Sequence, residues 1–195
     1  MLRYFIAYKP FQVLTQFSRA QGKNTLKDFF SVSRDVYPVG RLDYDSEGLL
    51  LLTNDKPLNN RLLNPLSHYE KEYWVQVEGA ITGTELAQLE AGVIITVTGN
   101  SYLTKNCKAE LFFNSPAVPE RIPPIRFRKN IPTSWIRLTL TEGKNRQVRK
   151  MTAAVGYPTL RLIRTRLGNL NFEGLAPGAM KELSREEAYS KLFAW

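Results

Sequence analysis

The side chains best suited to chemistry lie in the segment GRLDYDSEGLLLLTND, residues 40–55. Three carboxylates, Asp43, Asp45 and Glu47, fall within five residues. A carboxylate can act as a nucleophile, a general base or a general acid. A pair such as Asp43 and Asp45 could also serve as the acid and base of a glycosidase, which cleaves a glycosidic bond. The remaining alternative is a solvated acidic turn without a chemical role.

The residues around these carboxylates predict how they are positioned. Gly40 begins the segment, and four consecutive leucines, Leu49–Leu52, follow Gly48. A glycine before a short polar stretch is typical of a tight loop, and an uninterrupted apolar run is typical of a strand buried on both faces. We therefore expect Asp43 in a loop that is held rigidly by the strand after it.

A second polar segment, residues 71–77, alternates as a half-buried strand does. The alternation predicts Tyr73, Val75 and Val77 on one face and Glu72, Trp74 and Gln76 on the other. Taken alone, Tyr73 could be an ordinary strand aromatic.

A third segment, residues 144–155, has the periodicity of an amphipathic helix that ends at Gly156. Val148, Met151 and Val155 share one side of this predicted helix. The cations Arg146, Arg149 and Lys150 lie away from that apolar stripe.

The net charge of +9 is concentrated in one part of the chain. Residues 120–166 contain twelve basic and two acidic side chains, whereas the remainder is close to neutral. This window includes much of a proline-rich loop, residues 114–133, whose stiff backbone we expect to present cations outside the core. The asymmetry favours a polyanion such as nucleic acid as partner over an inert basic surface.

Composition excludes several other classes of protein. A single cysteine, Cys107, and a single histidine, His68, allow neither an internal disulfide nor a zinc site with the usual four ligands. No run approaches the roughly 18 apolar residues of a membrane span. The sequence therefore predicts a cytoplasmic protein with no metal and no membrane partner.

The order of elements predicts an α+β fold around a mixed, mainly antiparallel sheet flanked by helices. Strands are expected at residues 3–8, 49–53, 71–77, 93–97, 135–140 and 159–167. Further helices are expected at residues 25–30, 57–63, 82–91 and 184–192, the last two opened by Thr-x-x-Glu and Ser-x-x-Glu capping boxes.

The three segments together resemble the motifs of pseudouridine synthases of the ribosomal-RNA type. The matching stretches are Gly40-Arg41-Leu42-Asp43, the Lys-x-Tyr-x-Val strand at residues 71–75, and the Glu-Gly-basic-x-x-Gln-Val-basic-basic-Met stretch at residues 142–151. The resemblance extends from Tyr8-Lys9-Pro10 to Leu175-Ala176-Pro177-Gly178. It implies one catalytic domain, residues 1–195, with an active-site cleft between two subdomains that divide near residues 65–70.

The loop Pro124–Lys129, followed by residues 131–135, also resembles a subgroup of this family. That subgroup acts on 23S rRNA of the large ribosomal subunit and lacks an N-terminal S4 RNA-binding domain. We accordingly expect no S4 domain here, because residues 4–10 already match the first strand of the catalytic domain.

The resemblance implies a role for each matching residue. Asp43 is expected to be the catalytic carboxylate, acting on a target uridine that is flipped out of the RNA. Tyr73 is expected to stack on the base of this uridine. Arg149 is expected to form an ion pair with Asp43, with Arg146 as an alternative cation. Arg41 is expected to help fill the space that the flipped nucleotide leaves in the RNA stack. Converting uridine to pseudouridine is an isomerisation, so no cofactor is expected.

The same resemblance leaves RNA docking to the basic residues. Phosphate contacts are expected from Arg126, Arg128, Lys129, Lys144, Arg146 and Lys150. The expected partner is 23S rRNA or a precursor particle, and the expected state is a monomer. A non-catalytic rRNA-binding or ribosome-assembly factor with this fold remains the alternative function.

Overall fold

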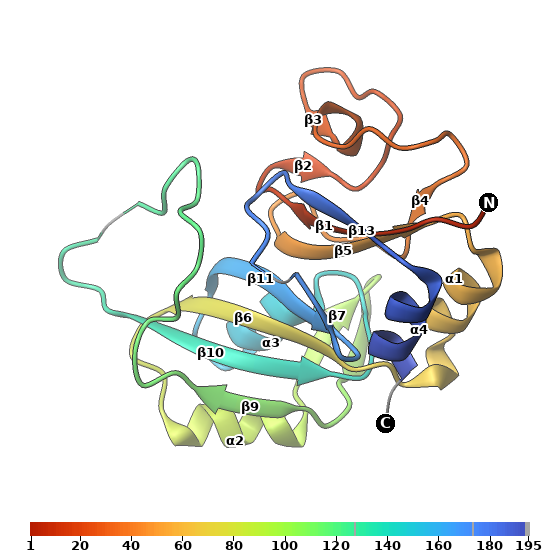
Figure 1. The fold of residues 1–195 in the computed structure, drawn as a ribbon. Helices are drawn as coiled ribbons and strands as arrows, with labels where there is room; N and C mark the ends of the chain where they lie inside the picture. Colours follow the sequence, from red (N-terminus) through yellow and green to blue (C-terminus); the bar gives the residue numbers. More distant parts are fainter. Residues whose placement is uncertain (127, 173, 194–195) are drawn as a thin grey trace. The chain divides into compact units, whose positions relative to one another are not determined.

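The computed structural model describes residues 1–126, 128–172 and 174–193. The chain forms two compact units (Figure 1). Unit 1 consists of residues 1–69 and 163–195, and unit 2 of residues 70–162. The strand β11 (Thr159–Leu167) begins in unit 2 and ends in unit 1.

Unit 1 is built around two neighbouring strands, β1 (Tyr4–Lys9) and β5 (Glu47–Thr53), which pair in antiparallel register. The sheet order is β13 (Met180–Leu183), β1, β5 and the end of β11, and β5 pairs with β11 in parallel. Shorter pieces complete the unit: β2 (Val13–Leu14), β3 (Asn24–Thr25), β4 (Tyr37–Pro38), β12 (Leu170–Asn171), and the 3-10 turns Leu26–Asp28 and Pro65–Ser67.

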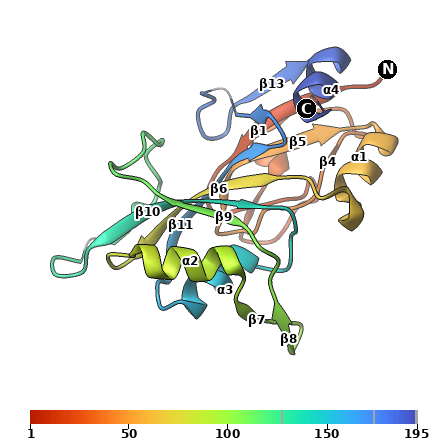
Figure 2. The ribbon, with the colours of Figure 1, turned by 90° about the horizontal axis from the view of Figure 1, so that it is seen from below.

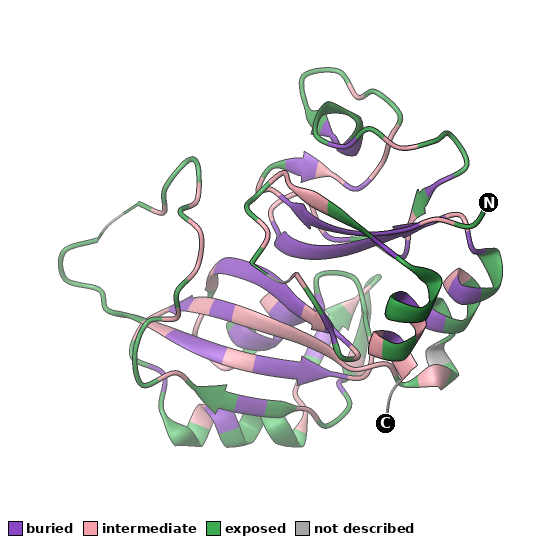
Figure 3. Cartoon of the chain, viewed as in Figure 1, coloured by how far each residue is buried: buried purple, intermediate pink, exposed green. Residues whose placement is uncertain are grey.

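Every residue of β1 and β5 is buried (Figure 3). Alternate side chains supply two separate clusters. Tyr4, Ile6, Leu49 and Leu51 pack with the helices α1 (Lys56–Leu63) and α4 (Arg185–Phe193). The intervening residues, Phe5, Ala7, Leu50 and Leu52, pack with Val13 and Leu26. The leucine run is therefore a strand buried on both faces, as its composition predicts.

Unit 2 contains the antiparallel order β6 (Lys71–Glu78), β10 (Thr133–Leu140) and β9 (Lys108–Leu111). The helices α2 (Gly83–Ala91) and α3 (Gln147–Ala154) lie on one side of these strands (Figure 2). Their apolar residues, Leu86, Leu89, Val148 and Met151, join the core formed by Val75, Val77, Ile136 and Leu138. A hairpin of β7 (Ile94–Val97) and β8 (Asn100–Leu103) completes the unit.

The predicted α+β class with a mainly antiparallel sheet is confirmed. The capping boxes of α2 and α4 also form: Glu85 accepts from the Thr82 N–H at 2.9 Å, and Glu187 accepts from the Ser184 N–H at 2.7 Å. Both motifs work because the acidic side chain bonds an N–H group that the helix itself leaves unpaired.

Several expected elements differ from those observed. The helix expected at residues 144–155 begins only at Gln147, because Arg146 adopts a left-handed conformation with φ of 52°. The segment expected as a helix at residues 25–30 forms only the 3-10 turn Leu26–Asp28. The strands β8, β9 and β13 were not predicted; their largely exposed sequences lack a buried apolar run, and partner strands decide their structure.

The close approach of β5 to β11 yields a test of packing. A Cβ atom on Gly48, where φ is +102°, would clash with the backbone N and O of Arg164. Gly22 also has a positive φ of +68°, but a Cβ atom there would meet nothing within 4 Å. We expect Gly48→Ala to lower the free energy of unfolding by about 2–4 kcal/mol more than Gly22→Ala, as measured by urea denaturation. Equal effects of the two substitutions would contradict this packing.

Candidate active site

Asp43 lies half-buried in the loop before β5, in unit 1. The loop begins after Val39, whose N–H donates to the Leu51 carbonyl at 2.8 Å, so its first end is fixed on β5. Gly40 follows with φ of +70°, a conformation that strains residues with a side chain. A turn in which the Ser46 N–H donates to the Asp43 carbonyl at 3.0 Å returns the chain to β5.

Thr15 fastens the middle of this loop. Its buried hydroxyl donates to the Leu42 carbonyl at 2.7 Å and accepts from the Leu42 N–H at 3.2 Å. One side chain therefore satisfies both backbone groups of the residue before Asp43. The contact restricts the backbone from which Asp43 projects.

Lys9, at the end of β1, is a fully buried cation next to the same loop. Its Nζ donates to the carbonyls of Pro10 at 2.9 Å and Val13 at 2.7 Å. Burial lowers the pKa of Lys9 to about 7, against the opposing attraction of Glu47, Asp45 and Asp43, and the nearby Arg164 lowers it further. The carboxylates of Asp43, Asp45 and Glu47 therefore interact electrostatically with the buried amine of Lys9.

Arg164 of β11, which is only 4% exposed, lies next to the start of β5, the strand that follows the loop. Its Nε donates to the Leu49 carbonyl at 2.9 Å, and its backbone lies opposite Gly48 in the parallel pairing. Thr15, Lys9 and Arg164 were not predicted as parts of the site. Lys9 had a signal, since Tyr8-Lys9-Pro10 belongs to the family resemblance; Thr15 had none, because its partner is 27 residues away in the sequence.

The other two expected catalytic residues lie in unit 2. Tyr73, on β6, is half-buried and packs at the edge of the core with Val75 and Val77 on the predicted face. Arg149 lies in the first turn of α3, half-buried, and its Nη1 donates to the Thr159 carbonyl at 3.3 Å. Their proximity to Asp43 stays a prediction.

Two polar residues of the third motif shape the start of α3. Gln147 is 4% exposed, and its side-chain amide donates to Glu142 at 2.6 Å and accepts from the Lys144 N–H at 2.9 Å. Glu142 also accepts from the Tyr102 hydroxyl at 2.5 Å and the Lys105 N–H at 2.9 Å. Burial acts to raise the pKa of Glu142, but these hydrogen bonds outweigh it and the pKa is lowered. These hydrogen bonds of Gln147 and Glu142 fix the residue at which α3 begins and therefore the position of Arg149 in its first turn.

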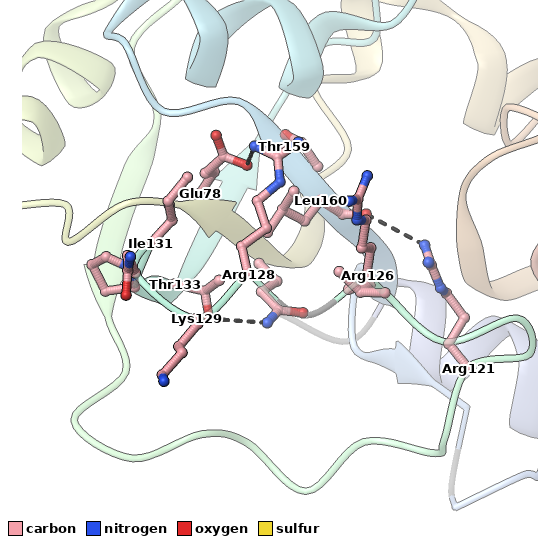
Figure 4. A pocket seen from close by; sticks show the side chains of 13 residues that line it. Glu78, Arg121, Arg126, Arg128, Lys129, Ile131, Thr133, Thr159 and Leu160 are labelled. Carbon is pink, nitrogen blue, oxygen red and sulfur yellow. Dashed lines mark hydrogen bonds and ion pairs between the residues drawn. The ribbon is translucent and has the colours of Figure 1, made fainter.

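The remaining expected RNA-binding residues fall in three places. Arg41 is exposed beside Asp43. Lys144 and Arg146 are exposed just before α3, with Lys144 Nζ 4.7 Å from the centre of the Tyr102 ring, and Lys150 is half-buried within the helix. Arg126, Arg128 and Lys129 are exposed and line one pocket of unit 2 (Figure 4). Phe127, which belongs to the same motif, lies outside the described residues.

Not every cation of the basic window faces solvent. Arg161 and Arg164 are 6% and 4% exposed and donate to the carbonyls of Pro119 and Leu49. Their charges stabilise backbone carbonyls instead of meeting a polyanion. The count of twelve basic residues therefore overstates the charge available to RNA.

Within the described ranges, no group of three or more His, Cys, Asp and Glu side chains is arranged to bind a metal ion. In the same part of the chain, no helix has the length and apolar character needed to cross a membrane.

Comparison with known proteins defines the class of this site. Residues 3–154 match the model of the RNA pseudouridylate synthase family. A crystal structure of a pseudouridylate synthase superposes with a TM-score of 0.79 at 27% identity, covering 99% of this chain and 74% of that one. The chain belongs to the RNA pseudouridylate synthase family, whose members isomerise uridine to pseudouridine, and it is an enzyme of this class.

Relatives indicate a subgroup of the family. The chain is 47% identical to ribosomal large subunit pseudouridine synthase E of Vibrio vulnificus, over 93% of this chain and 75% of the relative. It is 48% identical to the protein of the same name from Xanthomonas axonopodis pv. citri, over 87% of each. The subgroup that the Pro124–Lys129 loop resembles is this E group, and the relatives confirm that resemblance.

The buried amine gives a prediction for the pH dependence of stability. Lys9 has an ordinary pKa of 10.5 when unfolded and about 7 when folded, so between these pH values the unfolded chain binds a proton that the folded chain does not. Wild-type stability should therefore rise with pH relative to Lys9→Met, by up to about 1.4 kcal/mol per pH unit. Urea unfolding from pH 7 to 10 measures this difference, and the exposed Lys108→Met is the control. A difference independent of pH would show that Lys9 stays charged.

Proposed function

We propose that this enzyme isomerises one specific uridine of the large-subunit 23S rRNA to pseudouridine, with Asp43 as its catalytic carboxylate. The observation that carries the assignment of Asp43 is the restraint on its loop, where the Thr15 hydroxyl bonds both the N–H and the carbonyl of Leu42. Such rigidity suits a group that must meet a reacting atom in one orientation. The choice of RNA rests on the E-group relatives, which are named for the large ribosomal subunit.

The proposed reaction needs no external reactant. The bond from N1 of the uracil to C1′ of the ribose breaks, the base turns, and a bond from C5 to C1′ forms. C5 loses its proton and N1 gains one, so atoms and electrons balance. Asp43 contributes either by attacking C1′ and leaving again or by assisting elimination at the sugar. We accordingly include no cofactor and no metal in the proposal.

Further side chains complete the proposed site. Tyr73 stacks on the displaced base, and Arg149 pairs with Asp43 to keep it ionised and oriented, with Arg146 as the alternative cation. Arg41 helps to fill the space that the flipped nucleotide leaves. The half-buried environment of Arg149 on α3 favours it over the exposed Arg146.

The proposed RNA-binding surface consists of cations just before α3 and within it, together with cations of the proline-rich loop. We infer that the partner is 23S rRNA or a precursor particle, bound in the cytoplasm by a monomer. The cations assigned to phosphate contacts are Arg126, Arg128, Lys129, Lys144, Arg146 and Lys150.

Mapping pseudouridine on unmodified 23S rRNA, without added cofactor, tests the central proposal. We expect one new site with the wild-type protein and a rate lower by at least about 10²–10⁴-fold with Asp43→Asn. The matched control is Asp45→Asn, which removes a carboxylate two residues away and should retain activity. If both substitutions abolish the reaction, the paired-carboxylate mechanism gains support.

The same assay separates the two candidate cations. If Arg149 pairs with Asp43, Arg149→Lys should retain more activity than Arg149→Gln, while Arg146→Gln should mainly weaken RNA binding. A protein that binds 23S rRNA tightly yet modifies neither naked RNA nor a precursor particle would instead be an rRNA-binding or assembly factor.

Salt dependence tests the assignment of the cations. The affinity for a 23S rRNA fragment should fall as salt rises, because each neutralised phosphate releases counterions. Lys129→Ala should reduce the slope of log K against log salt by about 0.7–0.9, whereas Lys108→Ala, which removes a cation outside the loop that pairs with Glu70 at 3.3 Å, should not. An affinity that does not change with salt would refute the phosphate contacts.

A further inference from the structure

Unit 2 contains a pocket of about 720 Å³ beneath the proline-rich loop (Figure 4). Its walls come from the end of β6, the start of β10, the start of β11 and the loop residues 121, 125–126 and 128–132. Its volume lies within the range of pockets that bind small organic ligands. The catalytic proposal assigns no role to the cavity itself.

Hydrogen bonds to backbone carbonyls fasten the loop that lines the pocket. Arg121 donates from Nε to the Pro123 carbonyl at 2.9 Å and from Nη1 to the Leu160 carbonyl at 3.4 Å. Arg161 donates to the Pro119 carbonyl at 2.7 Å, and the Gly79 N–H donates to the Pro132 carbonyl at 2.7 Å. These bonds tie both ends of the loop to strand regions of the same unit, so the pocket has a defined wall.

The charge of the lining suits a phosphate. Four cations, Arg121, Arg126, Arg128 and Lys129, face one carboxylate, Glu78. Arg128 pairs with Glu78 at 2.9 Å (Figure 4), and the other three cations leave the pocket with an excess of positive charge. Arginine and lysine side chains are the usual protein partners of phosphate groups.

The rest of the lining suits a base. Ile125, Ile131, Pro132 and Leu160 supply apolar surface against which a flat ring can pack. Gln76 donates one amide N–H to the Thr133 hydroxyl at 3.1 Å, and its side-chain oxygen can accept a hydrogen bond. The Glu78 carboxylate has further lone pairs beyond those used by Arg128. Two acceptors in one wall favour a base with an exocyclic amino group.

The position of the pocket on β6 separates it from the proposed role of Tyr73. Gln76 and Glu78 have even positions along the strand, and Tyr73 and Val75 have odd positions. The β6–β10 register is unbroken from Lys71 to Glu78, so side chains alternate strictly between the two faces. The pocket therefore opens on the face of β6 opposite to Tyr73.

We propose that this pocket binds a second, unpaired nucleotide of the RNA substrate, one whose base has an exocyclic amino group, through its phosphate and its base edge. This inference rests on the proposed function, since it assumes that the substrate is RNA. The nucleotide is adenosine, cytidine or guanosine, and not the uridine that is isomerised. Binding it fixes the RNA relative to unit 2 and contributes to the choice of target site.

Methyl NMR of the full chain tests the pocket independently of catalysis. The probes are AMP, CMP, GMP, UMP and inorganic phosphate at millimolar concentrations, and the reporters are the methyl groups of Ile125, Ile131 and Leu160. We expect AMP, CMP or GMP to shift these signals at lower concentration than UMP, and phosphate alone to leave them nearly unchanged. Gln76→Leu should abolish the preference over UMP. Shifts of equal size with all probes, or with none, would overturn the proposal.

Kinetics with 23S rRNA separate this proposal from the function itself. We expect Gln76→Leu and Arg126→Ala to raise KM about tenfold with kcat nearly unchanged, because they remove binding that is the same in ground and transition states. The exposed Arg34→Ala, which removes a cation outside the pocket, is the control. Full activity in both pocket variants would refute the pocket and leave the enzyme assignment intact; absence of pseudouridine in the wild-type reaction would refute the function instead.

Discussion

The complete burial of β1 and β5 is the constraint on which unit 1 depends. Both strands contribute side chains to two hydrophobic clusters, so their ends are buried and shielded from solvent. The carboxylate loop and Lys9 lie at those ends, where charges are poorly solvated and must be compensated locally. Lys9 meets this requirement with two backbone carbonyls and a lowered pKa, and Thr15 satisfies the backbone of Leu42. The rigidity of the Asp43 loop follows from these contacts.

In unit 2, hydrogen bonds between a few polar side chains and the backbone also fix the local structure of the proposed site. Gln147 and Glu142 bond each other and the neighbouring N–H groups, and in doing so end the loop and begin α3. Arg149 is placed by that first turn. The motif that identifies the family thus contains residues that build the local structure as well as a residue proposed for the chemistry, and the two kinds cannot be told apart by their spacing alone.

The prediction from sequence succeeded where local pattern and tertiary environment agree. The leucine run of β5, the alternation of β6 and the capping boxes of α2 and α4 all have strong local signals. It was wrong where packing decides the structure. Arg146 interrupts a helical pattern because the clamp from Gln147 fixes the turn before it, and Arg161 and Arg164 are buried although a charge count places them with the surface cations.

The sequence by itself determined the family and the α+β class, and it predicts which carboxylate reacts, because the motifs are long and their order is specific. Only the tertiary structure decided which residues support that carboxylate, since Thr15 and Arg164 are 27 and 121 positions away from Leu42 and Asp43 in the chain. It also decided that the basic loop lines a pocket. The loop cations and the acceptors Gln76 and Glu78 are separated by more than 40 residues, and only the folding of the loop against β6, β10 and β11 brings them into one cavity.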